Sequence, residues 1–255
     1  MTAWDVRVFL RAFGGAVLGL VVVWLVTAAS DEGQLTVGAR AGRTLPLAPL
    51  CSAVGAALAL GTGRVREEVR ALEALGRSPA ESARAAALGA ALPSIVIAIA
   101  IAAVSQVDVA AFYPRVPRGD TFVFRNGAFE STSLGVRIDR EGETYRLEDP
   151  TAGTDDDLPR GARISAAAAT GIAGLALALV AAGAVLRRSL QDQKQRRRFR
   201  AWTAAQGVAC ALLTLVAFQA AAVRAAPAVL AIVPSTLLLG AVLVAQLRTT
   251  RSRTT

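Results

Sequence analysis

The sequence contains no histidine and a single lysine, Lys194, although it carries 28 basic and 19 acidic residues. Without histidine, the commonest general acid–base group and the commonest neutral metal ligand are excluded. No phosphate-binding loop of the Gly-x-x-x-x-Gly-Lys-Ser/Thr type is present either. We therefore predict that this chain holds no catalytic residue, no metal site and no cofactor of its own.

Cysteine is nearly absent as well. Cys51 and Cys210 both fall within apolar stretches, so the sequence provides no disulfide framework. The three adjacent carboxylates Asp155 to Asp157 suggest a metal site only weakly. A run of this kind in a loop is more typical of a solvated linker.

Charge is missing from six long stretches: 12–30, 44–63, 85–107, 164–186, 201–223 and 225–247. Each is 19 to 23 residues long, and about 20 helical residues cross the apolar core of a bilayer. The composition agrees, with 54% hydrophobic residues and a mean hydropathy of +0.47. We predict an all-α, multi-pass membrane protein with six transmembrane helices. The second stretch is rich in Gly and Ala, which predicts close approach of neighbouring helices.

The positions of lysine and arginine predict the orientation. With the N-terminus in the cytoplasm, 17 of the 28 basic residues lie in inside segments, and eight of the 11 outside lie in one long loop. Both termini and residues 63–83 are therefore predicted to be cytoplasmic. The net charge of +9 is then attributed to contact with anionic headgroups, and nucleic acid is not expected as a partner.

The six predicted transmembrane stretches divide the chain into three segments. Residues 1–107 hold the first three transmembrane helices, and residues 164–255 hold the last three with a basic cytoplasmic loop and tail. Between them, residues 108–163 form an external insert. In this insert, Asn126-Gly127 is a strong two-residue hairpin signal between residues 121–125 and 128–132. A second turn lies between residues 134–139 and 144–148. We predict a small β module of about four strands.

Residues 63–83 form a short charged segment between two apolar stretches. Its apolar residues recur at helical spacing and share one face: Val65, Val69, Leu72 and Leu75. Gly76 suits a helix end, and Ser78 to Glu81 form a capping box for the next helix. The apolar face fits either an interfacial helix resting on lipid or a helix docked in a groove of a soluble partner. Periodicity alone favours the first.

No transmembrane stretch carries Asp, Glu, His or Lys away from its ends. Ion-coupled carriers usually need such a residue near the membrane midplane. Intramembrane proteolysis by paired aspartates lacks its catalytic groups for the same reason. The chain therefore shows no energy source of its own.

Three features of the sequence occur together. Leu45-Pro46-Leu47 opens the second stretch, and Gly63-Arg64 and residues 67–78 follow it, matching the pattern E-x-x-A-L-x-A-x-G-x-S from Glu68 to Ser78. The helices are arranged three plus three around an external insert. Ala226-Pro227 and 231–235 are similar to a last span that reads A-W-x-P-N. Together these features resemble the permease subunits of lipopolysaccharide-export ABC transporters, of the LptF and LptG type.

The resemblance implies a bacterial inner-membrane permease that pairs with a second, like or identical, permease subunit and docks on a cytoplasmic ABC ATPase dimer, where ATP and Mg bind. It favours the docking role for 63–83, with these coupling residues: Glu67, Glu68, Val69, Leu72, Leu75, Gly76 and Ser78. Its substrate would be lipopolysaccharide or a related glycolipid or phospholipid, passed toward a periplasmic bridge protein. Arg40, Arg43 and Arg224 are candidates for binding lipid phosphate, and ordinary interfacial loop arginines account for them equally well.

The sequence also departs from this family. The family's periplasmic jelly roll is much larger than the insert of about 55 residues found here. Ile232 and Ser235 stand where the family's last span has tryptophan and asparagine. The short insert therefore keeps open a second hypothesis, a non-transporting membrane scaffold or regulator that retains the permease fold.

Overall fold

The computed structural model describes residues 2–30, 37–104, 107, 109–113, 123–125, 128–131, 136–138, 144–146, 158–186 and 193–251. Within this part, six helical segments are long and apolar enough to cross a membrane. Three of them are single long helices: α1 (Ala3–Ser30), α5 (Pro79–Ala103) and α6 (Ala162–Leu186). The fifth is the apolar part Ala201–Ala222 of α7 (Gln193–Ala222), and the sixth, Ala228–Gln246, joins the 3-10 turn η4 (Ala228–Ile232) to α8 (Val233–Arg251). The second, Arg40–Gly61, joins α2 (Val37–Thr44), the 3-10 turn η1 (Leu45–Leu47) and α3 (Ala48–Gly61). The predicted six apolar helices are confirmed.

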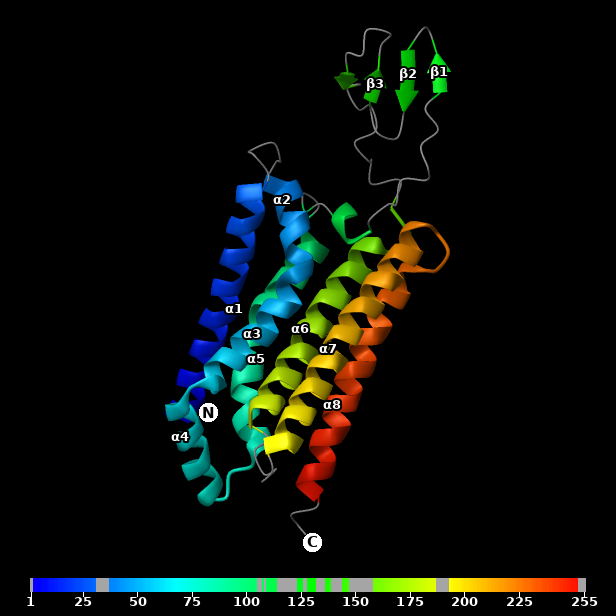
Figure 1. Cartoon of the computed structure of the whole chain (residues 1–255). Helices are drawn as coiled ribbons and strands as arrows, with labels where there is room; N and C mark the ends of the chain where they lie inside the picture. The colour runs from blue at the N-terminus through cyan, green and yellow to red at the C-terminus, as the bar shows by residue number, and fades with distance from the viewer. Residues whose placement is uncertain are drawn as a thin grey trace.

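The helices form one bundle with both ends of the chain at the same end of it (Figure 1). In the most apolar parts of the second, third and fourth spans, half or more of the residues are buried (50%, 50% and 56%). In the first, fifth and sixth spans only 11%, 17% and 17% of them are buried. Helix α5 packs along α6, α3 and α1, and α8 packs on α6. The second to fourth spans thus make the core, and the first, fifth and sixth present apolar side chains outward.

Small residues set the spacing of the core helices. A methyl group on Gly89 of α5 would lie 2.3 Å from the carbonyl oxygen of Phe9 in α1, and one on Gly55 of α3 would lie 2.6 Å from that of Ala12. In lipid, where apolar burial between helices gains little, this close backbone contact supplies much of the packing energy. The close approach expected from the Gly- and Ala-rich second stretch is confirmed.

A polar contact joins two helices inside the bundle, and a third packs against it. The hydroxyls of Ser52 in α3 and Ser94 in α5 lie 2.7 Å apart, and both side chains are fully buried. A methyl group on Gly174 of α6 would lie 2.7 Å from the Ser94 hydroxyl oxygen. A larger residue at position 174 would therefore separate α6 from this hydrogen-bonded pair.

The far end of the bundle, away from the chain termini, is held by an aromatic cluster and one arginine. The rings of Phe112 and Tyr113 meet Phe218 of α7 edge-on at 5.8 and 5.1 Å, and the Tyr113 hydroxyl donates to the carbonyl of Ala162 at 2.8 Å. Arg163 donates to two carbonyls at the end of α5, at 3.1 and 2.7 Å. Both ends of the insert are thereby attached to the bundle.

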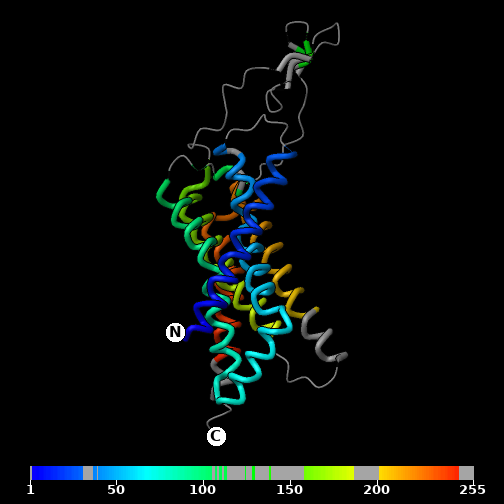
Figure 2. Tube along the Cα trace, turned by 90° about the vertical axis from the view of Figure 1, so that its left-hand side faces the viewer, coloured from blue at the N-terminus to red at the C-terminus, as the bar shows by residue number. Residues whose placement is uncertain are grey.

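Four short strands pair beyond this end of the bundle (Figures 1 and 2). They are β1 (Val123–Arg125), β2 (Ala128–Ser131), β3 (Val136–Ile138) and β4 (Thr144–Arg146), antiparallel in the order β1-β2-β3-β4. Phe124 faces Phe129 in the β1–β2 register. The turn at Asn126-Gly127 and the carboxylates Asp155 to Asp157 lie outside the described residues. That the insert as a whole forms a β module stays a prediction.

The basic segment between the fourth and fifth spans differs from its expected loop structure. Helix α7 begins at Gln193 and runs through the arginine-rich residues that were expected to be loop. No proline or glycine occurs between Gln193 and Arg200 to end a helix. Arg187 and Arg188, from the same basic segment, lie outside the described residues.

Candidate coupling site at the end of the bundle

The charged segment 63–83 folds as a helix, a stop and a new helix. Helix α4 (Gly63–Ala74) lies at the end of the bundle that carries the chain termini (Figure 1). Gly76 takes φ +91° and its N–H donates to the carbonyl of Glu73 at 3.0 Å, while the N–H of Arg77 donates to that of Leu72 at 3.0 Å. These two bonds form a Schellman motif. The predicted stop at Gly76 is confirmed.

The next helix starts at the predicted cap. The Ser78 hydroxyl accepts from the backbone N–H of Glu81 at 3.2 Å, and the Glu81 carboxylate accepts from the N–H of Ser78 at 3.1 Å. This reciprocal pair is the expected capping box, with Pro79 at the first helical position. Two defined helix ends, only four residues apart, leave α4 and α5 joined by a short elbow with little freedom.

The apolar stripe of α4 faces the bundle, which corrects the expectation that it is free to meet lipid or a partner. Val65 is fully buried, Val69 is 4% exposed, and Leu72 packs against the same core cluster. Leu75, the last member of the stripe, is 84% exposed. Packing on the protein's own core requires the same periodicity as docking on another surface, so the spacing alone did not distinguish them.

The outward side of α4 is mostly polar. Glu67, Arg70 and Glu73 are exposed there, and Leu75 and Gly76 are exposed at its C-terminal tip. Of the seven predicted coupling residues, the three on this surface are Glu67, Leu75 and Gly76. Val69 and Leu72 anchor the helix instead, Glu68 is turned toward α1, and Ser78 caps α5.

Glu68 ties the middle of α4 to the start of α1. One carboxylate oxygen accepts a hydrogen bond from the indole N–H of Trp4 at 3.0 Å. The other lies 3.5 Å from the guanidinium of Arg7 and 3.4 Å from Nε of Arg64. The Glu68 side chain is only 25% exposed, so these partners compensate its partial loss of water.

The elbow after α4 is tied to the same turn of α1. Arg77 pairs with Asp5, and its guanidinium also lies over the Trp4 ring, 5.1 Å from the centroid. Asp5 in turn accepts from the backbone N–H of Thr2 at 2.8 Å. We call the set Trp4, Asp5, Glu68 and Arg77 the α1–α4 clamp. Its members are 64 and 72 residues apart in the chain, and the sequence predicted only Glu68 as a functional residue.

The three candidate lipid-binding arginines lie at the opposite end of the bundle, in two places. Arg40 and Arg43 belong to α2, and the Arg40 guanidinium is 5.9 Å from the Trp24 ring of α1. Arg224 lies in the turn after α7 with φ +58°. Figure 1 shows α2 and this turn on opposite sides of that end. The structure therefore does not assemble the three into a single site.

The contacts of α4 link it mechanically to α1. Within the described ranges, no group of three or more His, Cys, Asp or Glu side chains comes together as a metal ligand set. Comparison with protein-family models, curated proteins and solved structures finds no match to this chain. Inferences about function therefore rest on the geometry of α4 and the six spans.

Proposed function

We propose that this protein is the membrane subunit of an ATP-driven lipid transporter. In this proposal it pairs with a second permease subunit and presents α4 to a cytoplasmic ABC ATPase dimer. It extracts lipopolysaccharide, or a related glycolipid or phospholipid, from the bacterial inner membrane for export toward the outer membrane. The observation that carries the proposal is a short helix clamped at one end of a six-helix bundle with its polar side outward.

The burial of the α4 stripe favours docking over a position in the lipid surface. An interfacial helix is held by apolar side chains that enter the membrane, but Val65 and Val69 already lie in the protein core. What α4 leaves exposed is a polar surface with one leucine at its tip. A polar surface with one apolar anchor suits contact with a soluble protein better than contact with acyl chains.

The α1–α4 clamp supports a lever role. A partner that displaces the outward side of α4 would also displace α1, because Glu68 and Arg77 hold the first turns of α1. Helix α1 packs against α3 and α5, so its displacement would be transmitted to the core helices of the bundle. Its exposed apolar side chains, with those of α7 and α8, offer surfaces for the second permease and for lipid.

Purification of the native complex in mild detergent tests the proposal. We expect an ATPase to co-purify and a membrane lipid, identified by mass spectrometry, to be enriched on the complex and released when ATP is added. The short insert also supports a second function, a scaffold that keeps the permease fold without transport. In that case the ATPase co-purifies but no lipid is enriched or released. Absence of any ATPase would contradict both.

The proposed orientation, with both termini and α4 in the cytoplasm, makes a labelling prediction. The two native cysteines are buried, so new surface cysteines report with little background. In intact inner-membrane spheroplasts, Leu75→Cys should be protected from an impermeant maleimide until the cells are broken, whereas Val37→Cys at the other end should react directly. The reverse pattern would place α4 outside and exclude a cytoplasmic ATPase as its partner.

A further inference from the structure

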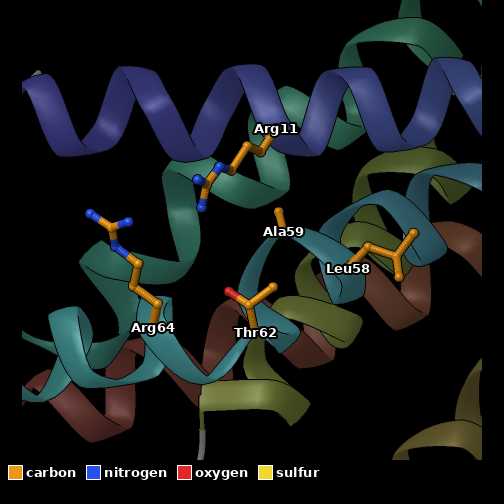
Figure 3. A pocket seen from close by; sticks show the side chains of 5 residues that line it. All are labelled: Arg11, Leu58, Ala59, Thr62 and Arg64. Atoms are coloured by element: carbon orange, nitrogen blue, oxygen red, sulfur yellow. The ribbon is translucent and has the colours of Figure 1, made fainter.

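A shallow hollow of about 370 Å³ opens between α1 and the junction of α3 and α4 (Figure 3). It is lined by Arg11, Leu58, Ala59, Thr62 and Arg64. In Figure 3 the guanidinium groups of Arg11 and Arg64 lie on the same side of the hollow, one from α1 and one from α4, and Leu58 lies at its other side. The hollow thus combines a cationic rim with an apolar wall.

The rim carries more positive charge than the nearby carboxylate balances. Among the described residues no acidic group lies within 4 Å of Arg11, and Arg64 shares Glu68 with Arg7. Thr62 stands at the N-cap of α4 without using its side chain as a cap. The hollow therefore lies beside the N-terminus of α4, where the helix dipole favours an anion.

The position of the hollow along the helices indicates which kind of anion it would bind. Arg11 lies six residues beyond Asp5, about 9 Å further along α1, and directly precedes the first charge-free stretch. Leu58 is 59% exposed and belongs to the second span, Arg40–Gly61. When the six spans cross a bilayer, this order along the helices would place the polar rim at headgroup level and the apolar wall at the level of the acyl chains, where a soluble protein does not reach.

We propose that this hollow binds an anionic phospholipid of the leaflet at the α4 end of the bundle, with the phosphate between Arg11 and Arg64 and an acyl chain along Leu58. Guanidinium groups bind phosphate oxygens through paired donors. The bound phosphate would bridge α1 and the first turn of α4, and so reinforce the α1–α4 clamp. The site lies at the opposite end from Arg40, Arg43 and Arg224, and it requires neither the ATPase nor a transported lipid.

The test uses the full chain in neutral detergent, titrated with short-chain phosphatidylglycerol or phosphatidylcholine, with binding followed by native mass spectrometry. We expect the wild-type protein to prefer phosphatidylglycerol. Arg11→Gln and Arg64→Gln should each weaken that binding by about ten-fold, the loss of one charge-assisted contact, and the double variant should lose the preference. Arg70→Gln removes the same charge from the exposed side of the same helix and should leave binding unchanged.

Two further measurements distinguish loss of the lipid site from loss of folding and from a change of charge alone. The thermal midpoints of the variants without added lipid should equal that of Arg70→Gln, and Arg11→Lys, which keeps the charge but not the paired donors, should bind with intermediate affinity. The proposal is overturned if the double variant retains the preference, if the wild type shows none, or if inorganic phosphate competes as well as the lipid. It is also overturned if the double variant loses only ATPase association, since the hollow would then belong to the docking surface.

Discussion

Replacing Gly89 by alanine is expected to destabilise the bundle by about 2 to 3 kcal/mol, although alanine is the better helix former by about 1 kcal/mol. The added methyl group would lie 2.3 Å from the carbonyl oxygen and 2.9 Å from Cα of Phe9. Both are backbone atoms of α1 that no change of side-chain rotamer can remove. Helix α1 must therefore move away from α5, and it loses packing along its length.

The measurement is the unfolding midpoint in a titration of mixed detergent micelles with SDS. Gly14→Ala is the matched control, because a methyl group there meets nothing within 4 Å. It should leave stability unchanged or raise it by up to about 1 kcal/mol through helix propensity. Equal effects of the two substitutions would show that α1 does not pack on α5 as described.

Leu75→Asp is expected to weaken association with the ATPase by about 30-fold, the effect of losing a buried interface anchor worth about 2 kcal/mol. Leu75 is 84% exposed at the tip of α4, so the substitution removes little packing within the chain. In a docked complex, by contrast, the new carboxylate would lose water without gaining a partner. Association should therefore fall while the thermal midpoint of the isolated protein stays the same.

The experiment is a titration of the purified, detergent-solubilised protein with the ATPase, comparing three variants. Val37→Asp places the same charge on a residue that is 71% exposed at the opposite end of the bundle, and it should bind as the wild type does. Leu72→Asp should lower both association and the thermal midpoint, because Leu72 anchors α4 to the core. Normal binding by Leu75→Asp would exclude the tip of α4 from the docking surface.

Several features could be predicted because their causes are local in the chain. The six spans follow from the length of stretches without charge, since a charge in the bilayer core is costly wherever the helix packs. The stop at Gly76 and the cap at Ser78 depend on hydrogen bonds that reach only three to five residues along the backbone. The strands beside Asn126-Gly127 were expected for a comparable reason, the backbone preference of one dipeptide.

The orientation of α4 was beyond such reasoning. The spacing of Val65, Val69 and Leu72 requires an apolar surface to cover them. It does not indicate whether lipid, a partner or the protein itself supplies that surface. The α1–α4 clamp was missed for a related reason. Trp4 and Asp5 resemble ordinary residues at the start of a membrane helix, and nothing near them in the chain indicates Glu68 or Arg77 as partners.

The amino-acid order alone was enough for the number of spans and for the elbow between α4 and α5, because each depends on solvation or on hydrogen bonds within one or two helical turns. Only the folded bundle could show which side of α4 is left for a partner and that α1 is bound to it. Those features arise from contacts between separate helices, such as the bonds of Trp4 with Glu68 and of Asp5 with Arg77, 64 and 72 positions apart, and such contacts exist only once the helices have packed.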